Sequence, residues 1–142
     1  MSDTLVIGYG NPLRQDDGVG PRVAEVVAAW NRPGVRALAL QQLLPELAQT
    51  LATVRQVIFV DASATEEAVQ LRPLTLENEE HSLTHHGDPR WLLSLTARLY
   101  HHHPRAWLLT IPASKLDFGE ELSFTTARGL ETALLHIERL LP

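Results

Sequence analysis

The sequence contains no cysteine. Disulfide bonds, thiolate metal sites, iron–sulfur clusters and cysteine nucleophiles are therefore excluded. Any metal ligand must be a carboxylate, an imidazole or a carbonyl group, and the seven histidines of the chain gain interest for that reason.

Basic residues are also few, since 12 Lys and Arg stand against 17 Asp and Glu. Nucleic-acid binding rests mainly on Lys and Arg contacts with phosphates, so this acidic balance argues against a nucleic-acid partner. No apolar run approaches the roughly 20 residues of a membrane span. The first residues lack the basic start and the apolar core of a secretory signal. We therefore expect a cytoplasmic protein with no membrane partner.

Apolar runs and helical patterns alternate along all 142 residues, a length typical of one domain spanning 1–142. The runs predict strands at 4–9, 35–40, 56–61, 69–76 and 106–111. Helical spacing predicts helices at 18–30, at 43–51, from 89 onward and after 123. This alternation predicts an α/β fold, a three-layer αβα sandwich with a mostly parallel central sheet of about five strands.

A few residues indicate where elements begin or lie. Asp88 followed by Pro89 is typical of a helix start, with an acidic N-cap and a proline in the first turn. Ser123 is a candidate cap for the last helix. Pro73 places the strand at 69–76 at an edge of the sheet.

Acidic residues follow two of the predicted strands. Asp16 and Asp17 lie in the loop after 4–9, and Asp61 ends 56–61. Ligands of open α/β sheets bind beyond the carboxyl ends of the strands. If these two strands are neighbours, the three acids converge on one edge, and a histidine from the polar stretch with His81, His85 and His86 could join them. Carboxylates with an imidazole suit a divalent ion such as nickel or zinc.

Each of these residues also has a structural interpretation. Asp16 or Asp17 can cap the helix that follows, Asp61 can bind its own backbone in a turn, and a loop histidine is more often solvated than ligating. The run 101–103, three histidines, is expected at a helix C-terminus and not among the ligands. Spacing alone leaves both interpretations open.

Gly8 and Gly10 after the first strand suggest a dinucleotide-binding turn. The third glycine of that fingerprint is replaced by Leu13. Asp16 and Asp17 would also repel a pyrophosphate. A nucleotide-binding domain or small phosphatase is therefore disfavoured.

The segment from Gly8 to Gly20, GYGNPLRQDDGVG, resembles the opening motif of the hydrogenase maturation endopeptidases, nickel-dependent proteins that trim the C-terminus of the large subunit of [NiFe] hydrogenases. The apolar strand ending in Asp61-Ala62, the pair Thr84-His85 and the turn FGEELS at 118–123 are similar to later segments of the same family. The resemblance covers essentially the whole chain.

The resemblance implies a peptidase whose nickel contacts are Asp17, Asp61 and His85, with His86 as the alternative to His85. Asp16 is a further candidate, as general base or supporting acid. The nickel is expected to arrive on the cysteines of the large-subunit precursor, so that only a loaded precursor is cut, and other divalent ions can substitute. Neither an aspartic-type nor a metal-dependent mechanism is singled out. We expect a monomer.

A second hypothesis is a non-enzymatic chaperone that binds a metal or the C-terminal tail of the precursor on the same scaffold. Loss of a short C-terminal peptide from the precursor would indicate the enzyme. A stable complex without cleavage would indicate the binder.

Overall fold

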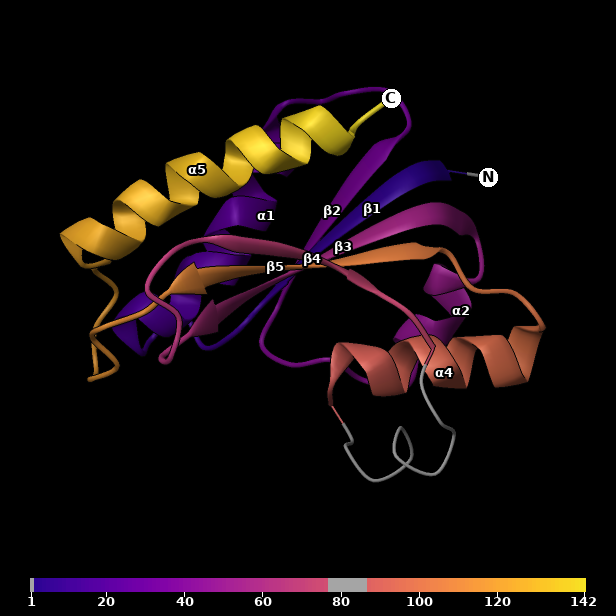
Figure 1. Ribbon diagram of the computed structural model, residues 1–142, viewed down its shortest axis with the longest axis horizontal. Coiled ribbons are helices and arrows are strands. Elements are labelled where there is room, and N and C mark those ends of the chain that lie inside the picture. The colour runs from indigo at the N-terminus through magenta and orange to yellow at the C-terminus, as the bar shows by residue number, and fades with distance from the viewer. Residues whose placement is uncertain (1, 77–86) are drawn as a thin grey trace.

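The computed structural model describes residues 2–76 and 87–142. Five strands form one sheet in the order β2-β1-β3-β5-β4. They are β1 (Ser2–Tyr9), β2 (Val35–Leu40), β3 (Val54–Ser63), β4 (Gln70–Leu74) and β5 (Arg105–Pro112). Only β4 is antiparallel to its neighbour in this sheet. The predicted mostly parallel sheet is confirmed, and each apolar run lies in a strand (Figure 1).

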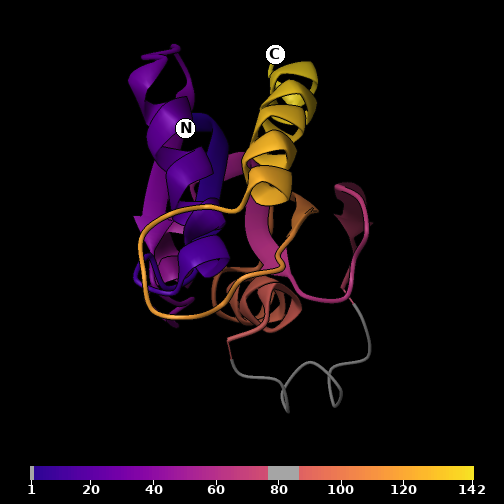
Figure 2. The same cartoon turned by 90° about the vertical axis from the view of Figure 1, so that its left-hand side faces the viewer.

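Helices cover both faces of this sheet. One face carries α1 (Val19–Ala29) and α5 (Phe124–Leu140), and the other carries α2 (Leu47–Leu51) and α4 (Pro89–Tyr100), as Figures 1 and 2 show. The predicted αβα sandwich is therefore confirmed. The helix expected at 43–51 begins only at Leu47, and Leu43 packs in the core from the irregular segment before it. Within the described ranges, no helix has the length and apolar character needed to cross a membrane.

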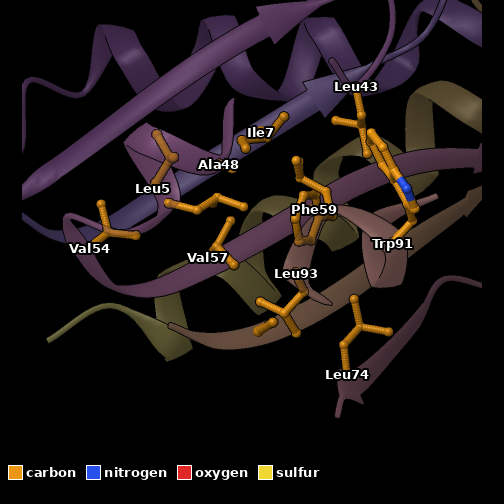
Figure 3. Close-up of a cluster of buried hydrophobic side chains, with 13 residues drawn as sticks. Leu5, Ile7, Leu43, Ala48, Val54, Val57, Phe59, Leu74, Trp91 and Leu93 are labelled. Atoms are coloured by element: carbon orange, nitrogen blue, oxygen red, sulfur yellow. The ribbon is translucent and has the colours of Figure 1, made fainter. Parts of the chain in front are cut away.

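Side chains of the central strands alternate between two apolar clusters. Leu5 and Ile7 of β1 face α2 and α4, where Phe59 and Trp91 join them (Figure 3). Val6, between them in the chain, packs in the cluster on the α1 and α5 side. Because both faces are buried there, the middle of each strand is an unbroken apolar run, 5–7 in β1 and 57–60 in β3.

The local signals at element ends are also confirmed. Pro73 lies in β4 at the edge of the sheet, where a missing N–H costs little. The Asp88 carboxylate accepts from the backbone N–H of Arg90 at 2.7 Å and so caps α4. The Ser123 hydroxyl accepts from the N–H of Thr126 at 3.3 Å and caps α5.

A contact between two glycines fixes how close α1 lies to β1. A Cβ added to Gly8 would lie 1.8 Å from the carbonyl oxygen of Gly20, and one added to Gly20 would lie 2.6 Å from the carbonyl oxygen of Val60. Neither residue can therefore carry a side chain without moving the helix from the sheet. The glycines of the opening motif thus have a packing role, and they set where the loop between β1 and α1 lies.

Gly8→Ala should lower the free energy of unfolding by about 3 kcal/mol or more, because the new methyl meets backbone that cannot rotate away. Gly87→Ala is the matched control. Gly87 has a positive φ of 88°, but among the described residues no atom lies within 4 Å of an added Cβ, so the loss there should be about 1 kcal/mol. Urea denaturation of both variants measures the difference, and equal losses would contradict the packing argument.

Candidate functional site

The candidate site lies at the carboxyl edge of the sheet, which we define as the C-terminal ends of β1, β3 and β5 with the loops that follow them. β1 pairs with β3, and β3 with β5, all in parallel. The loop after β1 and the end of β3 therefore meet at this edge, as expected for neighbouring strands.

Asp17 lies in a short 3-10 helix, η1 (Gln15–Gly18), and closes the loop after β1. Its Oδ2 accepts from the backbone N–H of Asn11 at 2.7 Å. The helix-cap interpretation of Asp17 is wrong, because the N-cap of α1 is Gly18 and no side chain makes the capping bond. This hydrogen bond fixes the Asp17 carboxylate at the carboxyl edge, in a half-buried position.

Asp61 ends the apolar part of β3 and is half-buried beside Tyr9 of β1. The Tyr9 hydroxyl donates to Asp61 Oδ2 at 3.1 Å. Burial, together with the negative charges of Asp61 and Asp88, raises the pKa of Tyr9 far above its ordinary value. The phenol therefore stays protonated and acts as a permanent donor to Asp61.

The pKa of Asp61 rises from an ordinary 3.8 to about 6. Burial is the largest cause, and the charges of Asp17 and Asp88 add to it. Hydrogen bonds from Tyr9 and from the N–H of Ala62 act in the opposite direction without cancelling the rise. Asp61 is thus close enough to Asp17 and Asp88 to sense their charges, and its carboxyl group titrates close to neutral pH.

Asp88 was predicted as a helix cap, and its place near the site was missed. The cap itself is confirmed, but the charge of Asp88 also raises the pKa of both Asp61 and Tyr9. A usable signal was present in the sequence. A helix that returns antiparallel to the strands begins at their carboxyl ends, so the N-cap of α4 falls on the same edge.

Asp16 is neither a helix cap nor a free general base. It is fully buried, and its carboxylate accepts from the backbone N–H groups of Ser123, Ser114 and Lys115 at 2.7, 2.9 and 2.9 Å. The Ser123 hydroxyl donates to it as well, at 2.7 Å. Burial alone would raise the pKa of Asp16, but these donors outweigh it and hold the pKa well below its usual range. Asp16 therefore ties the loop after β1 to the segment between β5 and α5.

Six of the seven histidines fall into two groups, and the seventh, His136, lies in α5. His81, His85 and His86 lie outside the described residues. The run 101–103 follows α4 at the opposite edge of the sheet, where the ring of His102 lies 3.4 Å from the carbonyl oxygen of Val54, the first residue of β3. The prediction that this run lies at a helix C-terminus is confirmed.

The described residues offer only part of a coordination sphere. Over 2–76 and 87–142, no three His, Asp or Glu side chains group closely enough to hold a metal ion. The carboxylates of Asp17 and Asp61 are nevertheless oxygen donors of the type that divalent cations accept, gathered where negative charge is unfavourable without a cation. The candidate histidines lie outside the described residues, so the structure describes two of the predicted ligands, Asp17 and Asp61.

Comparisons of the sequence with protein-family models and with curated proteins find no match. Solved structures do match. The [NiFe] hydrogenase maturation protease HybD from Thermococcus kodakarensis has a TM-score of 0.76 and 21% identity, over 99% of each chain. The hydrogenase maturating endopeptidase HybD from E. coli has a TM-score of 0.76 and 22% identity, over 95% of this chain and 89% of that one.

The hydrogenase 2 maturation peptidase from Thaumarchaeota archaeon SCGC_AB-539-E09 has a TM-score of 0.74 and 24% identity, over 97% of each chain. The chain has the fold of the hydrogenase maturation proteases. This likeness covers nearly the full length of both chains, so it includes the carboxyl edge of the sheet and not only the core.

Asp16→Ala should lower the free energy of unfolding at pH 7 by about 3 kcal/mol or more, because it leaves buried N–H groups unpaired. Since folding lowers the pKa of Asp16, its contribution is present above the ordinary pKa of 3.8 and is lost as pH falls below it. The difference in the free energy of unfolding between wild type and Asp16→Ala should therefore become smaller at acidic pH. Asp117→Ala, an exposed acid of the same segment, should change stability by less than about 0.5 kcal/mol. Urea denaturation at several pH values measures both, and a gap independent of pH would contradict the argument.

Asp61→Asn should stabilise the protein above pH 6. Folding raises the pKa of Asp61 to about 6, so the folded state favours the protonated carboxyl, and stability falls as pH rises through the window from 3.8 to about 6. The uncharged amide of Asn avoids this loss of stability, so the free energy of unfolding at pH 7 should rise by an amount on the order of 1–3 kcal/mol. Thermal or urea unfolding across this window tests it. Lower stability of the variant at pH 7 would show that the ionised carboxylate is favourable in the fold.

Proposed function

We propose that this protein is an endopeptidase that removes the C-terminal peptide from a nickel-loaded [NiFe] hydrogenase large-subunit precursor. One observation carries the proposal. The acids of the opening motif and of β3 converge at the carboxyl edge of a fold shared with proteins described as hydrogenase maturation proteases. The protein would act in the cytoplasm as a monomer, formed by the single domain 1–142.

In this proposal nickel belongs to the substrate and is the recognition element. Asp17 and Asp61 contact it together with His85, or with His86 if the register of that segment differs by one residue. The chain has no cysteine, so every thiolate on the nickel comes from the precursor. A nickel ion anchored on the precursor in this way needs only a few further ligands from the protease.

The residues of the chain prepare Asp61 for this contact. Tyr9 holds one carboxylate oxygen, while burial and the neighbouring charges keep the carboxyl half-protonated near pH 6. A cation placed beside Asp61 favours the ionised form. A correctly loaded precursor therefore relieves the charge repulsion at the edge, and an unloaded tail does not. This difference couples the metal to cleavage.

The carboxylate contacts are tested by incubating the nickel-loaded precursor with wild type, Asp17→Asn and Asp61→Asn. Asp17→Asn keeps an oxygen that can accept from Asn11, so its loop should stay closed. Both variants should process the precursor at least about 100-fold more slowly, because the anchored substrate is no longer positioned. Asp3→Asn, an acid that lies near the other end of β1, is the control and should cleave normally. Mass spectrometry detects the released peptide.

Normal processing by either variant would overturn the assignment of that residue. A stable complex of the wild-type protein with the precursor, without loss of the peptide, would replace the protease by a tail-binding chaperone on the same scaffold.

The histidine contact is tested in the same assay. His85→Ala should abolish processing and His86→Ala should not, while His103→Ala at the opposite edge should leave the rate unchanged. The reverse result for the first two variants would assign the contact to His86. Full activity of both would remove histidine from the site.

A further inference from the structure

One buried hydroxyl has no hydrogen-bond partner among the described residues, that of Thr110 in β5. Thr110 is 7% exposed, and its Oγ1 is buried and unpaired. Other buried threonines are paired. Thr126 Oγ1 donates to the carbonyl oxygen of Pro112 at 2.7 Å, and Thr4 Oγ1 accepts from the Gln56 side chain at 3.1 Å. Unpaired buried polar groups are rare in folded proteins, so this hydroxyl calls for an explanation.

The position of Thr110 in the sheet suggests one. Thr110 is the register partner of Asp61 on the neighbouring parallel strand. Its neighbours Leu109 and Ile111 pack in the cluster facing α1 and α5, so Thr110 points to the opposite face. Val60 packs in that same cluster, so by the same alternation Asp61 shares the face of Thr110.

Tyr9 shares this face as well, since it packs against the cluster that faces α2 and α4. Three polar side chains thus lie in a row across β1, β3 and β5, with Asp61 in the middle. Tyr9 already donates to the carboxylate from one side. Thr110 holds an unused donor on the other side, about one strand spacing (~4.8 Å) away.

We propose that Thr110 is a positioning residue for Asp61: when a divalent cation engages Asp61, the Thr110 hydroxyl donates to the carboxylate from the side opposite Tyr9. The inference rests on the proposed function, which places a cation there. An ionised carboxylate has room for several hydrogen bonds besides the one from Tyr9. Donors on both flanking strands fix the plane of the carboxylate, and partners of this kind tune how tightly a ligating side chain holds a metal.

The experiment measures Ni²⁺ binding to the full-length protein by isothermal titration calorimetry. Thr110→Val keeps the shape of the side chain and removes the hydroxyl, so it should weaken Ni²⁺ binding by about 10-fold. Thr110→Ser keeps the hydroxyl and should bind within about threefold of wild type. Thr4→Val, a buried threonine at the opposite end of the sheet, is the matched control and should bind Ni²⁺ normally.

Thermal unfolding of the same variants without added metal gives a second readout. Thr110→Val should unfold at the wild-type temperature or above, because it removes an unpaired polar group. Thr4→Val should unfold at a lower temperature, because the Gln56 side chain loses one of its hydrogen bonds. Marked destabilisation by Thr110→Val would show that the fold itself uses this hydroxyl, and would overturn the proposal.

Three results of the calorimetry would also overturn the proposal. Thr110→Val could bind Ni²⁺ as tightly as wild type, or Thr110→Ser could bind as weakly as Thr110→Val. The third such result is that wild type binds no Ni²⁺. The precursor-cleavage assay separates this failure from that of the proposed function. If wild type and Thr110→Val process the loaded precursor at the same rate, only the role of Thr110 is lost. If wild type does not process it, the proposed function itself fails.

Discussion

The carboxylate of Asp16 is the interaction on which the carboxyl edge depends. It is completely buried, yet it accepts hydrogen bonds from both ends of the segment between β5 and α5. Because Asp17 follows it directly in η1, the same anchor places Asp17 against the end of β1. A charge buried with this many donors is stable only when every donor is in place. The site is therefore built as one unit from segments distant in the sequence.

In contrast to Asp16, whose ionised form the fold stabilises, Asp61 is less stable in its ionised form. Its carboxyl is held where burial and two neighbouring acids disfavour the charge. Such sites cost stability in the absence of a cation and favour binding of one, and perturbed carboxyls of this kind gather at functional sites. Tyr9 limits the cost by donating to the carboxylate without carrying a charge. The chain thus keeps a partly buried carboxyl group at the edge of a sheet whose two core clusters are apolar.

The sequence predicted most of the fold because the signals for it are local. The apolar run of β3, the acid and proline that begin α4, and Pro73 in the edge strand each act over a few residues. The sequence also predicted that Asp17 and Asp61 lie close together, since this needs only that β1 and β3 be neighbours. The sequence did not predict that Asp16 anchors the loop after β1, because its hydrogen-bond partners lie about a hundred residues away in the chain. Thr110 escaped notice for a related reason, since only strand register places it beside Asp61.

The central claim is that nickel in the substrate, read by carboxylates at the sheet edge, decides whether the precursor is cut. The most direct measurement compares two preparations of the same large-subunit precursor, one loaded with nickel and one without metal, incubated with the wild-type protein and analysed by intact mass. The account predicts loss of the C-terminal peptide from the loaded precursor alone. Equal cleavage of both preparations would contradict it.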